Sequence, residues 1–522
     1  MSAAAVFLAA LLYGVLFGAF SEALIAAFIA PLGILAILVV WALPATDSVP
    51  VRWIEILFFA FFVALIVWPN YIALSIPGLP WITIIRLIGF PLAFLFVFCV
   101  FVSEKVRSTV RRALASSPAL TRLFLAFLVL EVISVAVSVD PALSLSRYVL
   151  VQMTWTTIFF AGCYVFMKPG RAMLWAAFAW GTAVVVIAIG LLEYSREQVL
   201  WAGHIPGFLK VGDEVVHRIL TPHFREYTGR YRTLSTFSTP LGFAEYLAFV
   251  LPFILHFAIE AKRLLVRLAA FATIPVLIYV VLLTDSRLGA VGCLLAVLLY
   301  GGYWSVRRWR GERSSLFGPA VALAYPLIIV CAIALTFVSN RVHAVVWGGD
   351  ATQIGSTNVR REQLDIAIPK IESRPWGYGM LMAADVVGYR TPGGILTLDS
   401  YYLTIVLEYG VVGFLIYYGM FGAAIFAASR KLLAERQDDP EMDLLLPALL
   451  TLVNFIVIKS VFSQDDNHPV IFMVLSMVVA LNCRLAAATP AAAEGSQRSP
   501  PAPLRHVPRA ERLLSRLPST GA

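Results

Sequence analysis

Uninterrupted apolar runs of about twenty residues recur along most of this chain, and they restrict its fold more than any other feature. A helix of about 20 apolar residues is long enough to cross the hydrocarbon layer of a bilayer. Windows of this kind fall near residues 3–20, 22–41, 52–68, 83–102, 121–139, 148–166, 172–192, 239–259, 268–284, 289–306, 318–338, 401–427, 443–462 and 469–483. The chain is 60% hydrophobic and only 14% charged, which excludes an ordinary soluble enzyme. We therefore expect an all-α polytopic membrane protein with roughly 12–14 transmembrane helices.

Basic residues occupy every second connection between these spans, in SEKVRSTVRRALASS, MKPGR, AKRLLVR, SVRRWRGER and SRKLLAERQ. The positive-inside rule places such connections in the cytoplasm. Residues 1–20 carry no Lys or Arg and are followed at once by a second apolar run, so we expect the first span to be retained and both termini to be cytoplasmic. The net charge of +9 is then explained by arginines facing anionic membrane lipids, and nucleic acid is not an expected partner.

This pattern divides the chain into two parts. Residues 1–483 are predicted to form a transmembrane helical domain with two long outer connections, 193–238 and 339–400. Residues 484–522 are rich in Pro, Ala and Arg and have no apolar core, so we interpret them as a disordered cytoplasmic tail.

Three arginines lie at or near membrane depth on the outer side. Arg86 lies just inside the outer end of the fourth span, Arg147 closes the short connection SVDPALSLSRYV, and Arg287 lies in TDSRLGAVG between two spans. A charge near the bilayer centre costs at least about 2.5 kcal/mol, so an ionisable residue retained there indicates function. Snorkelling to lipid phosphate explains Arg86 and Arg147 equally well.

Further arginines lie in the long outer connections, including Arg232, Arg360 and Arg361. Acidic residues balance most of this charge, so a solvated surface is the ordinary explanation for any one of them. Several outward-facing arginines also suit a multiply charged phosphate on a lipid, because one guanidinium binds two phosphate oxygens. A polyprenyl diphosphate, with its tail in the bilayer and its head at the outer leaflet, fits this arrangement.

Four segments in the second half of the chain resemble motifs of one family. They are RYRTLSTFSTPLGFAEYLAFVLPFIL (230–255), TDSRLGAVG (284–292), RREQLDIAIPKIESRPWGYG (360–379) and LDSYYLTIVLEYGVVGFLIYY (398–418). In this order and on one membrane face, they resemble the bacterial O-antigen ligase and polysaccharide polymerase superfamily. The resemblance covers roughly residues 230–420.

The resemblance implies a glycosyltransferase of the bacterial inner membrane that uses undecaprenyl-diphosphate-linked glycans at the periplasmic face, without a metal or another cofactor. The family's essential arginines correspond to Arg232 and Arg287, and to either Arg361 or its neighbour Arg360. Together with Arg86 and Arg147, they are the candidates for binding the substrate diphosphate.

Asp399-Ser400 stands where ligases of the family carry His-Asn, and an acid at this place is similar to the polymerase branch. A carboxylate there could act as general base on an acceptor hydroxyl, or either residue could cap a helix start. Glu408 lies nine residues on, about two and a half helical turns, so we expect the two acids to face opposite sides. We interpret Glu408 as orienting a helix or the long connection.

The implied mechanism has Arg232, Arg287 and Arg361 holding the diphosphate while Asp399 activates the acceptor, with inversion at the anomeric carbon. The acidic turn QDDNHP (464–469) is interpreted as a polar turn between two spans.

Glu245 and Lys459 are expected in or near the outer halves of their spans. There they either line the donor cavity or pair with each other or with a nearby arginine, and Glu245 is a candidate supporting residue.

The predicted function is polymerisation of lipid-linked repeat units into O-antigen or exopolysaccharide. One alternative is an O-antigen ligase, which transfers a finished glycan to lipid A core. Another is a flippase for lipid-linked oligosaccharides, but no internal repeat of two related halves is visible. A chain-length-regulating membrane protein is a further candidate partner.

Overall fold

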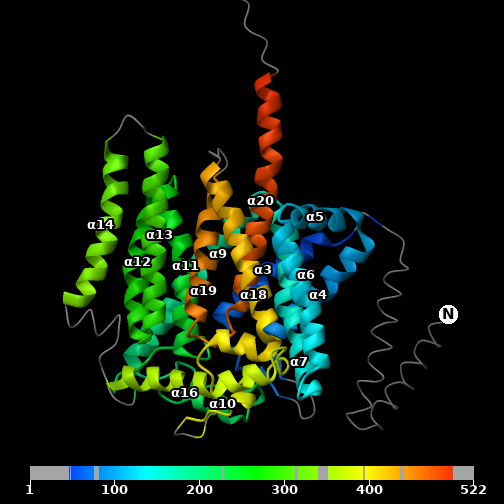
Figure 1. The fold of residues 1–522 in the computed structure, drawn as a ribbon, viewed down its shortest axis with the longest axis vertical. Helices are drawn as coiled ribbons and strands as arrows, with labels where there is room; N and C mark the ends of the chain where they lie inside the picture. The colour runs from blue at the N-terminus through cyan, green and yellow to red at the C-terminus, as the bar shows by residue number, and fades with distance from the viewer. Residues whose placement is uncertain are drawn as a thin grey trace, which may run out of the picture. The chain divides into compact units, whose positions relative to one another are not determined.

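The computed structural model describes residues 46, 49–75, 81–225, 229–311, 316–338, 351–391, 394, 396–434 and 440–497. Nearly all regular structure in these ranges is helical, and ten of the helices are long and apolar enough to cross a membrane (Figure 1). Two short strands, β1 (Ala73–Leu74) and β2 (Ile82–Thr83), pair antiparallel. The predicted all-α polytopic membrane fold is confirmed.

The chain divides into two compact units, residues 1–483 and residues 484–522, and the candidate site lies in the first. The helices before the first long connection are α3 (Val51–Val67), α4 (Ile84–Val102), α5 (Glu104–Ala115), α6 (Pro118–Ala136), α7 (Pro141–Val151), the π-helix η1 (Gln152–Thr156), α8 (Thr157–Phe166) and α9 (Arg171–Arg196). The first long connection contains the 3-10 helix η2 (Gly207–Leu209) and α10 (Glu214–Leu220).

The helices that follow are α11 (Pro240–Glu260), α12 (Leu264–Leu283), α13 (Arg287–Gly311) and α14 (Phe317–Val338). The second long connection contains α16 (Ala351–Ser373) and α17 (Ala383–Val387). The last helices are α18 (Tyr401–Ala434), the 3-10 helix η3 (Met442–Leu444), α19 (Leu445–Lys459) and α20 (His468–Gln497).

Most expected spans coincide with helices, including 52–68 with α3 and 318–338 with α14. The expected spans 3–20 and 22–41 lie outside the described residues. The expected start at residue 148 is wrong, because the helix begins at Pro141 and continues through η1 to Phe166. Asp140 sets this start, since its carboxylate accepts the Ala142 and Leu143 N–H groups at 3.1 and 3.0 Å. Arg147 therefore lies within α7 and not at the end of a loop.

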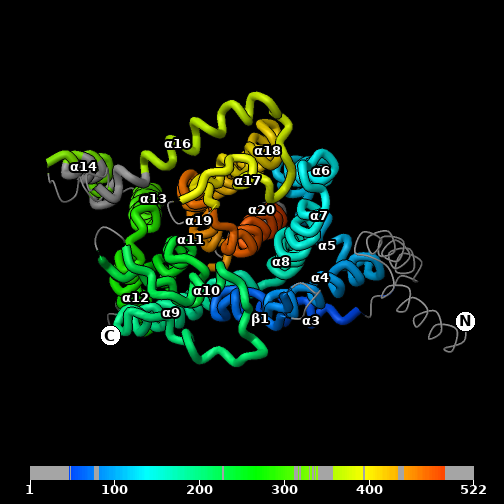
Figure 2. The backbone as a smooth tube through the Cα atoms, turned by 90° about the horizontal axis from the view of Figure 1, so that it is seen from below, coloured from blue at the N-terminus to red at the C-terminus, as the bar shows by residue number. Residues whose placement is uncertain are grey.

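α11 is buried along nearly its whole length, because PLGFAEYLAFVLPFILHFAIE is apolar on every side. The hydroxyl of Thr239 accepts the Gly242 N–H at 3.0 Å, and Pro240 follows the cap, which defines where the helix begins. Helices α9, α12, α13 and α19 pack against α11. Figure 2 shows α11 and α19 side by side.

Glycines bring α13 close to its neighbours. A Cβ at Gly289 would lie 2.7 Å from Ala244 Cβ on α11, and one at Gly292 would lie 2.8 Å from Ile458 Cδ1 on α19. Because α13 begins at Arg287 and α19 ends at Lys459, these contacts bring the first turn of α13 to the same end of the unit as the last turn of α19.

The two ends of the unit carry different connections. α5, the basic helix, lies across the upper end in Figure 1, whereas α10 and α16 lie across the lower end. The first half of α18 also lies at the lower end, where it contacts α16 and α17.

Candidate functional site

α18 is broken at Gly410, inside the segment LEYGVVG that carries the family resemblance. Gly410 has φ 74° and ψ 179°, outside helical geometry, so the helix consists of two parts. The Val411 N–H, at the start of the second part, donates to Pro375 O at 3.0 Å. A Cβ at Gly410 would lie 2.3 Å from Pro375 O, so only glycine allows the chain from α16 to approach this closely.

The segment SRPWGYG (373–379) satisfies the backbone groups that the break exposes. Tyr378 N–H donates to Leu407 O at 2.7 Å, and Gly379 N–H donates to Glu408 O at 3.2 Å. Gly377 has φ 96°, and a Cβ there would lie 2.5 Å from Glu408 O. Two motifs from separate parts of the sequence thus form one structure, which holds the long connection against α18.

Asp399 lies just before α18 and faces α16. Its carboxylate Oδ2 is 3.9 Å from Arg360 Nε, and its Oδ1 accepts the Thr397 hydroxyl at 3.4 Å. Its backbone N–H donates to Gln363 Oε1 at 2.9 Å. The side chain remains 32% exposed, so a substrate hydroxyl can approach it. Burial raises the pKa of Asp399, while Arg360 and Thr397 lower it less, which makes the carboxylate more basic than usual.

The two adjacent arginines of α16 have different surroundings. Arg360 points to Asp399, and burial lowers the pKa of its guanidinium, which the charge of Asp399 partly offsets. Arg361 follows it by about 100° around the helix and is exposed. The geometry therefore favours Arg360 as the arginine of this pair that faces the candidate site.

The start of α18 is tied to the end of α19. The Ser400 hydroxyl donates to Ser460 O at 2.9 Å, and the Tyr402 hydroxyl donates to Ile456 O at 2.6 Å. Asp399 thus lies beside the turn that joins α19 to α20, residues 460–467.

A buried ion pair lies beside this turn, at the last residue of α19. Lys459 Nζ is 2.7 Å from Glu245 Oε1, and both side chains are 0% exposed. Asn467 Nδ2 donates to Glu245 Oε2 at 2.8 Å, and Lys459 lies 5.3 Å from the centre of the Tyr401 ring. The pairing of Glu245 with Lys459, one of the expected arrangements, is observed, and it joins α11, α18 and α19.

Two acids of the same turn contact α7 and the segment before α11. Asp465 forms an ion pair with Arg147, whose guanidinium also lies 5.5 Å from the centre of the Trp155 ring. Asp466 accepts the Ser238 hydroxyl in the segment that leads into α11. The turn connects two spans as predicted, and it also joins α7 to the segment before α11, which sequence reasoning did not anticipate.

Arg232 and Arg287 lie on either side of the short turn between α12 and α13. Arg232 Nε donates to Thr284 O at 3.0 Å, and Arg225 Nη1 is 3.0 Å from Asp285 Oδ2. Burial and the charge of Arg225 lower the pKa of Arg232 to about 10, so it stays cationic at neutral pH. Arg287 begins α13 two residues after Asp285, at the end of the unit where Lys459 lies.

Arg86 and Arg147 line one cavity of about 970 Å³ between α4 and α7. Arg86 Nη1 donates to Trp81 O at 2.7 Å. The other lining residues are mostly apolar: Trp81, Ile82, Leu87, Phe90, Pro91, Ser146, Val149, Leu150 and Leu381. An apolar cavity with two guanidinium groups suits an amphipathic anion.

Glu408 has different neighbours from Asp399. Its carboxylate accepts the Leu381 N–H, and Arg147 lies near enough to interact with it electrostatically. Its backbone oxygen accepts the Ser134 hydroxyl of α6 at 3.0 Å. Glu408 thus contacts the connection after α16, whereas Asp399 faces α16 itself.

Sequence reasoning did not select two buried acids that organise this end of the unit. Glu193 of α9 accepts the Tyr231 hydroxyl at 2.8 Å and the Ser235 N–H at 2.6 Å, which fixes the segment that carries Arg232. Glu131 of α6 accepts Gln152 Nε2 of η1 at 2.7 Å. A single acid in an apolar span was the signal that could have identified both.

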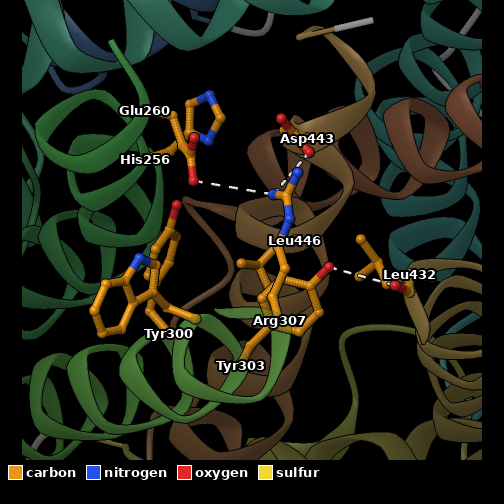
Figure 3. Close-up of a pocket in the computed structure, with 9 residues that line it drawn as sticks. His256, Glu260, Tyr300, Tyr303, Arg307, Leu432, Asp443 and Leu446 are labelled. Carbon is orange, nitrogen blue, oxygen red and sulfur yellow. Dashed lines mark hydrogen bonds and ion pairs between the residues drawn. The ribbon is translucent and has the colours of Figure 1, made fainter. Parts of the chain in front are cut away.

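A second polar cluster lies at the opposite ends of α11, α13 and α19 (Figure 3). Arg307 Nη1 lies 3.0 Å from Asp443 Oδ1 and 3.9 Å from Glu260 Oε1, and the Tyr303 hydroxyl donates to Leu432 O at 3.4 Å. These contacts join four helices, so we interpret the cluster as structural. Across the described residues, no group of three or more His, Cys, Asp or Glu side chains is arranged to hold a metal ion.

Comparison with known families finds a match in the second half of the chain. Residues 276–418 match the family model described as O-Antigen ligase. The matched segment contains Arg287, Arg360, Arg361, Asp399 and Glu408. It follows Arg86, Arg147, Arg232 and Glu245 in the sequence and precedes the turn between α19 and α20. A search of curated proteins found no match. The multi-pass membrane fold and the match over 276–418 together support an O-antigen ligase/polymerase-type membrane glycosyltransferase, and they confirm the resemblance to that superfamily for the segment from α12 through the broken helix α18.

Proposed function

We propose that this protein polymerises undecaprenyl-diphosphate-linked oligosaccharide repeat units at the periplasmic face of the bacterial inner membrane. The observation that carries the proposal is the partly exposed carboxylate of Asp399, next to Arg360, inside the segment that matches the ligase family. A carboxylate at this position suits a general base for an acceptor sugar.

In the proposed reaction, Asp399 takes the proton of an acceptor hydroxyl as its oxygen bonds to the anomeric carbon of the donor glycan. The bond from that carbon to the diphosphate oxygen breaks, and undecaprenyl diphosphate leaves with the electron pair. Attack opposite the leaving group inverts the configuration. Arg232, Arg287 and Arg360 lie at the same end of the unit and stabilise the negative charge that develops on the diphosphate. Arg361, the other expected arginine, is exposed and has a lesser role.

The cavity between α4 and α7 receives part of a lipid-linked substrate. Its apolar lining suits prenyl units, and Arg86 and Arg147 suit the diphosphate. Arg147 is also bound to Asp465 in the turn between α19 and α20, and the first residue of that turn, Ser460, accepts the hydroxyl of Ser400 beside Asp399. This chain of contacts provides a structural connection between the lipid cavity and the proposed base.

The alternative is an O-antigen ligase that transfers a glycan to lipid A core. The description of the matching family model favours it, whereas Asp399 in place of histidine favours the polymerase. The acceptor used distinguishes the two.

The test uses the full chain in nanodiscs with undecaprenyl-diphosphate-linked repeat units and no lipid A core, with products separated on a gel. A ladder of elongated glycans is expected. Asp399→Asn should slow elongation by about 10²–10⁴-fold, because the general base is lost. Asp365→Asn removes an exposed carboxylate of α16 and should leave the ladder unchanged.

Transfer that occurs only after lipid A core is added would assign the protein as a ligase. Full elongation by Asp399→Asn would exclude Asp399 as the base even if polymerisation occurs. If neither reaction occurs but the lipid-linked glycan still binds, a flippase would be the better explanation.

A further inference from the structure

α5 is a short basic helix at the end of the unit opposite α10 and α16 (Figure 1). It packs against α4, α6 and α8 through one apolar side that includes the buried residues Val106 and Val110. Lys105 and Arg111 are exposed on the helix. A helix with this division of side chains is suited to lie in the interface layer of a membrane.

A second cavity, of about 460 Å³, lies where α5 meets the end of α4 and the start of α6. Three arginines line it: Arg107, Arg111 and Arg122. The remaining lining residues are mainly apolar: Val100, Val110, Leu114, Ala115, Pro118 and Thr121. The cavity thus combines cationic and apolar surface, which is complementary to the anionic headgroup and the upper acyl chains of a phospholipid.

The three arginines differ in how their charges are balanced. Arg107 pairs with Glu104 and donates to the backbone oxygens of Val100 and Phe101, each at 3.0 Å. Neither Arg111 nor Arg122 forms an ion pair within the described ranges, and both are exposed. Two guanidinium groups without an ion-pair partner in the described part of the chain therefore line a cavity whose other walls are mainly apolar.

We propose that this cavity binds an anionic phospholipid, with its phosphate between Arg111 and Arg122 and the first part of an acyl chain against Val100 and Leu114. In the orientation that the basic connections indicate, the lipid belongs to the cytoplasmic leaflet, which carries negative charge. A soluble phosphate would leave the apolar walls without a partner, so the cavity favours a lipid. This site is separate from the proposed transferase site, which lies at the other end of the unit.

The experiment titrates the delipidated full chain in detergent with phosphatidylglycerol or phosphatidylcholine and counts bound lipids by native mass spectrometry. Phosphatidylglycerol is expected to bind at one site and phosphatidylcholine much more weakly. Each arginine near an anionic headgroup contributes about fivefold in affinity, so Arg111→Gln/Arg122→Gln should weaken phosphatidylglycerol binding by about 25-fold.

Two controls separate a site from general surface charge. Lys262→Gln/Arg263→Gln removes two exposed charges from the connection between α11 and α12 and should leave the affinity unchanged. Ala115→Trp keeps every charge but fills the cavity, and it should abolish binding. The thermal unfolding midpoint of each variant reports whether the fold is intact.

The proposal is overturned if both double variants lose affinity equally, because the effect would then be one of net charge. Unchanged binding in Ala115→Trp, or equal affinity for the two lipids in the wild-type protein, would also contradict it.

Discussion

Removal of the Arg360 charge should move the acidic limb of the pH–rate profile. Asp399 must be deprotonated to act as a base, so the rate rises with pH through its pKa. Arg360 lowers this pKa, since a neighbouring cation favours the carboxylate. The variant Arg360→Gln should therefore raise the pKa of Asp399 and shift the limb to higher pH.

The distance between the two groups sets the size of the shift. Arg360 Nε and Asp399 Oδ2 are 3.9 Å apart, and the two side chains are 39% and 32% exposed. Two unit charges at this distance interact by about 1 kcal/mol in a water-like dielectric, which is the appropriate minimum for a pair with this exposure. That energy corresponds to about 0.7 pH unit.

The assay measures the initial rate of elongation in nanodiscs between about pH 4 and pH 8, at saturating lipid-linked repeat unit. Arg361→Gln is the matched control, because it removes the adjacent charge from an exposed side chain and should leave the limb in place. A uniform fall in rate at every pH, without a shift, would mean that Arg360 acts on the substrate or the fold and not on Asp399. A shift to lower pH would refute the electrostatic reasoning itself.

Two further predictions concern the architecture around the site. Lys459→Met should reduce the free energy of unfolding by about 3–5 kcal/mol, because Glu245 is left buried without its partner. The double variant Glu245→Leu/Lys459→Met removes both charges and should reduce the free energy of unfolding much less. Thermal unfolding in detergent compares the two variants. Gly410→Ala should lower both the unfolding midpoint and the rate of transfer, since its Cβ would lie 2.3 Å from Pro375 O. Gly422→Ala is the control and should change neither quantity, because no atom lies within 4 Å of the added carbon. Equal effects of the two variants would contradict a specific role for the break in α18.

The sequence alone was sufficient to predict the membrane fold and most of its spans. Hydropathy over about 20 residues is a local property of the sequence. Because a helix of that length matches the thickness of the bilayer core, this local property is enough to predict a membrane-spanning helix. The same reasoning selected Glu245 and Lys459, because a charge in an apolar span requires a partner. Local reasoning failed at Arg147, where Asp140 and Pro141 begin the helix earlier than hydropathy indicates.

Only the tertiary structure decided how the separate motifs combine. The contact of the segment 373–379 with the break at Gly410, and that of Asp465 with Arg147, join residues far apart in the chain. The choice between Arg360 and Arg361 depends on the rotation of α16 relative to Asp399. Composition and spacing determine which residues prefer the membrane or its surface, but helix packing determines which of those residues meet, and that depends on the whole chain at once.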